Sequence, residues 1–268
     1  MRFLVYNIAY GTGAPRSYAH RALTLHRYLS STRHHIERLH AFILQLQPDV
    51  VGLVELDTGS FRTGGRNHAL DIARILAHDY TYSSKYQRGS MGRLLPVLRH
   101  QGNALFANEE LTSCEQHFLP AGFKRLVLDA RVYGTRILLV HLALNRHTRR
   151  KQLEYLGNIV GKSSEPVILA GDFNAFKGAH ELEELMHVTG LRTANRNREP
   201  TYPAWQPRKE LDFILCSDTI QLRNFEVLDS VRLSDHLPLL MDCTVTRPTS
   251  TAKTEPPYYG QTERVCRQ

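Results

Sequence analysis

The sequence predicts an α/β fold in which two packed, mixed β-sheets are flanked by helices. Short apolar runs of strand length recur along the chain and alternate with segments of helical periodicity. Hairpin signals are mixed with longer crossover connections, so both antiparallel and parallel strand pairs are expected. The short strands outnumber the helices, and this balance indicates two sheets packed together with helices outside them.

The N-terminal region has the pattern of a β-α-β unit. Residues 2–7 are the first expected strand, and residues 50–55 are the second, which is almost entirely apolar, as a strand buried on both faces should be. Apolar side chains recur between these strands at helical spacing, at Ile36, Leu39, Ile43 and Leu46. Pro48 ends this helix because proline has no backbone N–H for the helical ladder.

The remaining elements extend to residue 245. A helix that carries Leu70, Ala73 and Ala77 comes next, and later helices are expected over residues 148–160 and 180–186. The expected strands cover residues 104–107, 114–118, 124–132, 136–142, 167–170, 211–215, 222–227 and 238–245. A Tyr-Gly-Thr turn at 133–135 makes a hairpin of the strands on either side. Residues 247–268 lack an apolar pattern, so we expect a mobile tail there.

The composition is that of a folded globular protein. Hydrophobic residues make up 42% of the 268 residues and charged residues 22%, which argues against a mainly disordered, collagen-like or coiled-coil chain. No apolar stretch approaches the roughly 20 residues that cross a bilayer. The chain enters a strand pattern at once, and its four cysteines form no C-x-x-C pair. We therefore expect a cytoplasmic protein with neither a cysteine zinc site nor a dense disulfide framework.

The charge balance is basic. Lys and Arg number 34 against 26 Asp and Glu, which gives a formal net charge of +8. Two explanations stay open, a polyanionic partner such as nucleic acid or a merely basic surface. Arginine side chains, whose forked donors match phosphate oxygens, gather in one stretch, at Arg62, Arg66, Arg88, Arg93 and Arg99. For the second basic run, Arg149–Lys151, a solvated helix face is the favoured interpretation.

Polar residues end or interrupt the apolar strands in six places. These are Asn7, Glu55, His141, the run Gly171–Asn174, Asp212 within Leu-Asp-Phe-Ile-Leu, and the run Ser234–His236. Each lies where a strand would deliver a polar group to one rim of a sheet. Taken singly, turns explain Asn7 and Gly171–Asn174, and a core hydrogen bond explains His141. Asp212 fits a structural role as well as a catalytic one. Glu55 is harder to explain, because a carboxylate that ends an apolar strand needs a partner or a cation.

In their order along the chain, these six blocks resemble the endonuclease/exonuclease/phosphatase superfamily, which includes pancreatic-type deoxyribonuclease, abasic-site endonucleases, neutral sphingomyelinases and inositol polyphosphate phosphatases. The resemblance covers about residues 1–245, and its most specific parts are Gly171–Asn174 and Ser234–His236. It implies a four-layer α/β sandwich, formed by a domain over residues 1–246, with the site at the ends of the strands.

The resemblance also implies a metal site. Glu55 resembles the principal Mg²⁺ carboxylate, with Asn7 and Asp235 helping to position the metal or the phosphate. Mg²⁺ suits this set because it favours oxygen ligands, keeps several waters and completes its octahedron with substrate phosphate. Mn²⁺ is the expected substitute.

The catalytic residues implied by the resemblance are two histidines and the polar groups around them. His236 resembles the histidine that orients the attacking water or bonds the scissile phosphate, while Asp172 and Asn174 would hold the nucleophile and a phosphoryl oxygen. His141 with Asp212 resembles a second histidine–carboxylate pair. No carboxylate is identified for His236, for which the candidates are two acidic residues of the N-terminal half, Asp71 and Asp79.

The expected activity is a Mg²⁺-dependent phosphodiesterase that hydrolyses its substrate by in-line water attack, with DNA or RNA slightly favoured. The histidine branch of the superfamily fits better than the abasic-site branch, which usually has a tyrosine where His141 stands. A phospholipid or an inositol phosphate is the alternative substrate, because the apolar run Leu94–Leu98 between arginines would suit a membrane surface, although a buried edge strand is favoured there. A non-catalytic nucleic-acid-binding module is disfavoured, since Glu55 and His236 are both present. No obligate protein partner is expected.

Overall fold

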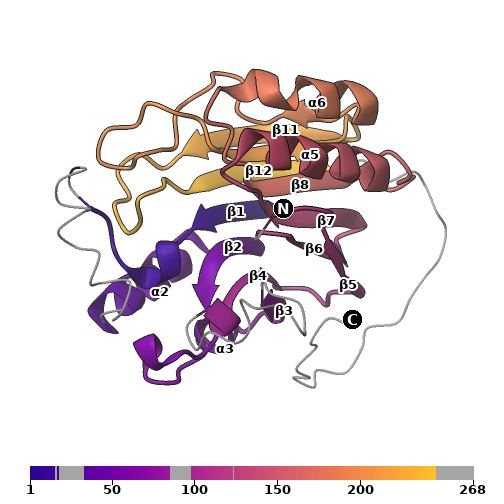
Figure 1. The fold of residues 1–268 in the computed structure, drawn as a ribbon. Coiled ribbons are helices and arrows are strands. Elements are labelled where there is room, and N and C mark those ends of the chain that lie inside the picture. Colours follow the sequence, from indigo (N-terminus) through magenta and orange to yellow (C-terminus); the bar gives the residue numbers. More distant parts are fainter. Residues whose placement is uncertain (16, 18–32, 85–97, 123, 246–268) are drawn as a thin grey trace, which may run out of the picture.

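Two six-stranded mixed sheets form the centre of the computed structural model, which describes residues 1–15, 17, 33–84, 98–122 and 124–245 (Figure 1). The first sheet has the order β11-β12-β1-β2-β4-β3 and the second β5-β6-β7-β8-β10-β9. The first sheet comprises β1 (Arg2–Asn7), β2 (Val50–Asp57), β3 (Asp79–Ser84), β4 (Gln101–Ala107), β11 (Ile220–Val227) and β12 (Leu239–Val245). The second comprises β5 (Ser113–Phe118), β6 (Leu126–Val132), β7 (Thr135–His141), β8 (Val167–Asp172), β9 (Arg192–Thr193) and β10 (Asp212–Cys216).

Helices cover the outer face of each sheet, which completes four layers. The helices α2 (Arg33–Leu46) and α3 (His68–Leu76) share an apolar cluster with the first sheet, through residues such as Ile43 and Ile72. The helices α5 (Arg146–Val160) and α6 (Glu183–Thr189) do the same on the second sheet, through residues such as Leu156 and Leu185. The expected four-layer α/β sandwich is confirmed.

The main core lies between the two sheets. It joins Val5 and Val54 of the first sheet to Leu139 and Ala170 of the second, and these side chains are at most 1% exposed. Because side chains alternate along a strand, the residue two positions further along each strand faces the same core. His141 lies two positions after Leu139, and Asp172 two positions after Ala170, so both face the inter-sheet core at its rim.

Strand direction brings the polar ends together at one edge of the sandwich. The strands β1 and β2 are parallel, with Asn7 opposite Val54, and β7 and β8 are parallel, with His141 opposite Asp172. Their carboxyl ends therefore share an edge. The antiparallel strand β10 runs the other way, so its first residue, Asp212, lies directly opposite Asp172.

The structure also differs from the expected elements in several places. The edge strand β3 was not expected, because its sequence Asp-Tyr-Thr-Tyr-Ser-Ser is mostly polar and only one of its side chains, Thr81, is buried. The helix expected over 180–186 is a 3₁₀ turn (Ala179–Leu182) followed by α6. The expected tail at 247–268 and most of Leu94–Leu98 lie outside the described residues. Over the part of the chain that the structure describes, no helix is long and apolar enough to span a membrane.

The prediction of a solvated face for Arg149 is wrong. Its side chain is 1% exposed, whereas the neighbouring Arg150 is 74% exposed. One Arg149 nitrogen donates to the carbonyl oxygens of Ala143 and Leu144, at 2.9 Å each, and another pairs with the carboxylate of Glu181. Arg149 therefore ties α5 to the segment that follows His141, a role that periodicity alone cannot reveal.

The burial of this ion pair gives a stability prediction. Arg149→Met should lower the free energy of unfolding by about 3–5 kcal/mol, because it leaves the Glu181 carboxylate and two carbonyl groups without their buried donor. Arg150→Met is the matched control and should change the free energy by less than about 1 kcal/mol, since exposed ion pairs contribute little. Urea unfolding of the two variants measures both values, and equal losses would contradict the assigned role.

Candidate active site

Glu55 lies in a bulge at the end of β2. Leu53 pairs with Ala104 and Leu56 with Gly102, so three steps along β2 match two steps along β4. Glu55 takes up the extra residue with a φ of 59°, in the left-handed region that residues other than glycine rarely occupy. Such conformations persist only where their surroundings fix them, and they cluster at functional sites.

The Glu55 carboxylate faces a cation and a histidine. Its Oε1 lies 3.7 Å from the Lys124 ammonium and 3.7 Å from His141 Nδ1. The same ammonium contacts His141 Nε2. Lys124 belongs to the segment that enters β6 and was not among the predicted site residues. It links Glu55 of the first sheet to His141 of the second.

Asp172 is the centre of the hydrogen-bond network. Its Oδ2 accepts from Asn7 Nδ2 at 3.0 Å and lies 3.2 Å from His141 Nε2 and 3.9 Å from His236 Nε2. Its Oδ1 accepts from the backbone N–H of Asn174 at 2.9 Å. Burial raises the pKa of Asp172 to about 6, the nearby charge of His236 opposes the rise, and that of the Asp212 carboxylate adds to it.

The carboxylate partner of His236 is Asp212. His236 Nδ1 lies 2.8 Å from Asp212 Oδ2, and the hydroxyl of Thr201 donates to the same oxygen at 2.6 Å. Burial by itself would lower the pKa of His236, but the charges of Asp212 and Asp172 and the bond to Asp212 raise it to about 10. The side chain is therefore an imidazolium at neutral pH.

This geometry corrects the expected pairing of His141 with Asp212. The strand β10 lies beside β8 on the side away from β7, so Asp212 faces His236, while His141 faces Asp172 and Glu55. The two carboxylates suggested for His236 lie elsewhere. Asp71 pairs with Arg66 at 3.1 Å, and Asp79 accepts from the backbone N–H of Leu111 at 2.8 Å.

Hydrogen bonds hold the side chains of Asn7 and Asn174, and Asp235 lies beside His236. Asn7 Oδ1 accepts from the Ala9 N–H at 3.0 Å, which leaves its amide nitrogen to reach Asp172 across the sheets. Asn174 has a φ of 52°, and its Nδ2 donates to the Leu142 carbonyl at 3.0 Å. Asp235 is 5% exposed, and its charge also acts to raise the pKa of the adjacent His236.

Two residues of the site, Lys124 and Thr201, were not expected from the sequence. Neither belongs to a short motif. Lys124 was expected within the strand over 124–132, but the strand begins at Leu126, and Thr201 lies in a connecting segment. The arginines near the second strand also differ from expectation. Arg62 is buried, 3.9 Å from Asp57 and above the ring of Tyr10, while Arg66 is exposed. Arg88 and Arg93 lie outside the described residues.

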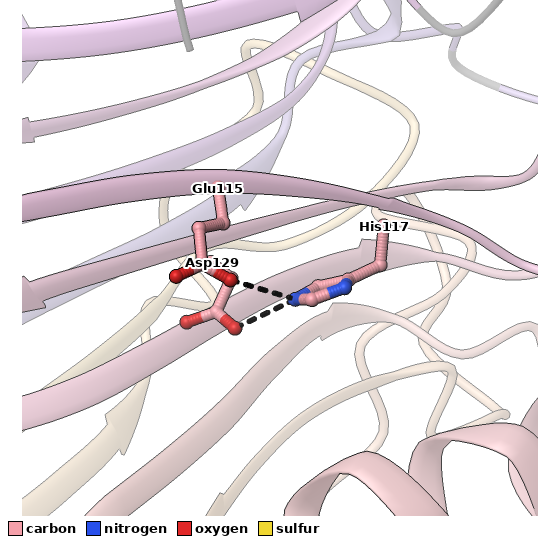
Figure 2. A group of neighbouring side chains, drawn as sticks. All are labelled: Glu115, His117 and Asp129. Carbon is pink, nitrogen blue, oxygen red and sulfur yellow. Dashed lines mark hydrogen bonds and ion pairs between the residues drawn. The ribbon is translucent and has the colours of Figure 1, made fainter. Parts of the chain in front are cut away.

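A second group of possible metal ligands lies away from this edge. Glu115, His117 and Asp129 meet on β5 and β6, with His117 Nε2 2.8 Å from Asp129 and 3.9 Å from Glu115 (Figure 2). Arg136 already binds the Asp129 carboxylate through three hydrogen bonds of 2.6 to 3.1 Å. These contacts make the group an ion-pair network.

Glu55 fits a divalent metal. Its carboxylate is a hard oxygen ligand at the mouth of the site and already faces a cation, the Lys124 ammonium. Asn7 ends the neighbouring strand β1 and pairs with Val54, the residue before Glu55. Asp172, Asp212 and His236 also have ligand atoms that all lie within 4.8 Å of one another. The hydrogen bond of His236 to Asp212 and its ion pair with Asp172 favour a catalytic role for these three, which leaves Glu55 as the candidate metal ligand.

A sandwich edge that gathers buried carboxylates, amides and an imidazolium has the groups that a phosphoester-hydrolysing centre needs. The chain belongs to the endonuclease/exonuclease/phosphatase family, whose sequence model matches residues 4–236. Members of this family are phosphoric ester hydrolases that depend on a divalent metal. The chain is an enzyme of this class.

Several solved structures share this fold. The catalytic domain of human Nocturnin, solved with a bound sulfate anion, is 22% identical, has a TM-score of 0.65 and covers 92% of this chain and 93% of its own. The mannosyl-6-phosphatase of Bacteroides thetaiotaomicron is 14% identical, with a TM-score of 0.66 and coverages of 91% and 99%. An endonuclease/exonuclease/phosphatase from Beutenbergia cavernae is 19% identical, with a TM-score of 0.66 and coverages of 91% and 71%. A comparison with curated proteins found no match.

Proposed function

We propose that this protein is a Mg²⁺-dependent phosphodiesterase that hydrolyses its substrate by in-line attack of water. The observation that carries the proposal is the buried set of Asp172, Asp212 and His236, whose two aspartates lie on the second sheet while Glu55 lies on the first. A carboxylate with a raised pKa next to an imidazolium provides a proton acceptor and a hydrogen-bond donor within one small space.

Asp172 is the group that positions the attacking water and accepts its proton. Its Oδ2 is 3.0 Å from Asn7 Nδ2 and 3.9 Å from His236 Nε2, so the carboxylate is fixed between an amide and a cation. The backbone N–H of Asn174 donates to Asp172 Oδ1, which holds Asn174 beside the same carboxylate. These bonds hold the carboxylate in one orientation before the substrate arrives.

His236 stabilises the negative charge that develops on the phosphate. Asp212 accepts from its Nδ1, which fixes the ring and directs Nε2 towards Asp172 and the reacting centre. An imidazolium in a buried site donates a strong hydrogen bond to a phosphoryl oxygen. His141, held between Asp172 and Glu55, is the second histidine that faces the phosphate. A divalent metal at Glu55, assisted by Asn7 and Asp235, supplies Lewis-acid stabilisation of the phosphate oxygens when bound.

Nucleic acid is the substrate that we favour. The net charge of +8 suits a polyanion. Binding through contacts to several phosphates would weaken as the salt concentration rises. One structurally similar protein is a mannosyl-6-phosphatase, so a phosphomonoester belongs among the substrates to be tested.

A substrate panel tests this proposal. DNA, RNA, a bis-aryl phosphodiester, an aryl phosphomonoester and phosphoinositide vesicles are incubated with Mg²⁺, with Mn²⁺ and with chelator. We expect DNA or RNA and the aryl phosphodiester to be hydrolysed with Mg²⁺ and not with chelator. Nucleic-acid affinity should fall at least tenfold between about 50 and 200 mM salt, because several phosphates are neutralised. Hydrolysis of the monoester alone would overturn the phosphodiesterase assignment. Hydrolysis of the phosphoinositide vesicles alone would show that the substrate is a lipid rather than nucleic acid.

A further inference from the structure

Gln152 is a buried side chain of α5 that organises two segments of the active site. It is 0% exposed, and all of its polar atoms are used. Its Oε1 accepts from the N–H of Ala143 at 2.9 Å, two residues after His141. Its Nε2 donates to the carbonyl oxygens of Ala121 and Lys124 at 2.7 and 2.9 Å. One amide therefore fixes the backbone that leaves β7 and the backbone that enters β6.

The segment held by Gln152 is shaped to pack against α5. Gly122 has a φ of +91°, and a Cβ at this position would lie 2.8 Å from Thr148 Cγ2 and 3.2 Å from Gln152 Nε2. A side chain would push the segment away from the helix, so glycine is needed for the two carbonyl groups to reach the amide. The backbone of Lys124, just before β6, is thus held against α5.

The side chain of Lys124 extends from this fixed backbone into the site. Its ammonium contacts His141 Nε2 and lies 3.7 Å from Glu55 Oε1, and the side chain is 25% exposed. An ammonium carries three donors on a flexible stem, so it retains a donor for a further acceptor. The side chain is a quarter exposed, so solvent or a bound substrate can approach it.

We propose that Lys124 is a further catalytic residue whose ammonium binds a non-bridging oxygen of the substrate phosphate, and that Gln152 is its positioning residue. This inference rests on the proposed function. A cation placed where negative charge develops stabilises the transition state more than the ground state. The long stem of lysine would otherwise have to be ordered during the reaction, and the bonds of Gln152 to the Ala121 and Lys124 carbonyl oxygens fix its base beforehand.

Lys124→Met removes the ammonium and keeps the length of the side chain. With a bis-aryl phosphodiester and Mg²⁺, we expect kcat/KM to fall on the order of 10²-fold, as for loss of one preorganised donor. Lys124→Arg should recover part of that loss. The matched control is Lys162→Met, an exposed lysine beyond the other end of α5, which should behave as wild type.

Binding of inorganic phosphate gives a readout that does not depend on turnover. Titration calorimetry at fixed Mg²⁺ should show roughly tenfold weaker phosphate binding by the Lys124→Met variant, since one charge-assisted contact is lost. Phosphate affinity and kcat/KM equal to those of wild type would overturn the proposal. So would unchanged phosphate affinity with a shifted Mg²⁺ requirement, because Lys124 would then act only as a counterion of Glu55.

A double-mutant cycle tests the role of Gln152. If Gln152 acts through Lys124, Gln152→Met should lower kcat/KM in the wild type by tenfold or more and have little further effect in Lys124→Met, because contacting residues are not additive. Equal losses in both backgrounds would overturn the positioning role. Should Gln152→Met fail to fold, the Lys124 variants still decide whether the ammonium binds phosphate. A wild-type enzyme without phosphodiesterase activity would overturn the proposed function, whereas an active wild type with an equally active Lys124→Met overturns this inference alone.

Discussion

His236→Ala should lower kcat/KM for a phosphodiester by at least about 10²-fold while most of the protein stays folded. The variant removes an imidazolium whose pKa the Asp212 and Asp172 carboxylates raise, and positioned acid–base groups contribute rate factors of this size. Steady-state kinetics with Mg²⁺, together with circular dichroism of the same preparation, separate lost catalysis from lost fold.

The ion-pair network of β5 and β6 provides a matched control. His117 makes the same 2.8 Å contact with a buried carboxylate, Asp129, that His236 makes with Asp212. His117→Ala therefore removes an equivalent histidine–aspartate pair outside the site and should leave kcat/KM within a few-fold of wild type. If both variants lose activity only in proportion to their folded fraction, His236 is a structural histidine and the mechanism is wrong.

Glu55→Gln should abolish most of the metal-dependent turnover. The substitution keeps the shape of the side chain in the bulge of β2 but removes the charge that faces Lys124 and would hold the metal. Loss of several kcal/mol of charge stabilisation corresponds to a decrease of about 10²-fold or more in kcat. Activity is measured across a Mg²⁺ titration and again with chelator, which gives the residual metal-free rate.

Glu115→Gln is the control for this variant. Glu115 also lies beside a histidine and a buried aspartate, but its side chain is 55% exposed and belongs to the ion-pair network. We expect its Mg²⁺ titration to match that of the wild type. If Glu55→Gln keeps both the rate and the Mg²⁺ dependence of the wild type, Glu55 is not the metal ligand.

The strand-end residues could be predicted because their signal is local. A polar residue at the end of an apolar run, such as Asn7, Glu55 or Asp172, lies at a sheet edge whatever the neighbouring strands are. Charge at the end of a buried strand is costly without a partner, so the sequence itself indicates that something must compensate it. The family resemblance then joined these positions into one site, and the structure brings His141, Asp172, Asp212 and His236 together.

The tertiary structure decided which of these residues are partners. Asn7 and Asp172 are separated by 165 residues, and Asp212 and His236 by 24, so their contacts depend on which strands become neighbours. Because β10 lies beside β8, Asp212 pairs with His236 rather than with His141. The packing of α5 buries Arg149 and positions Lys124 in the site. Periodicity records which face of an element is buried but carries no record of what lies opposite. These contacts are therefore fixed by long-range sheet pairing and side-chain packing, which the sequence encodes only through the whole fold.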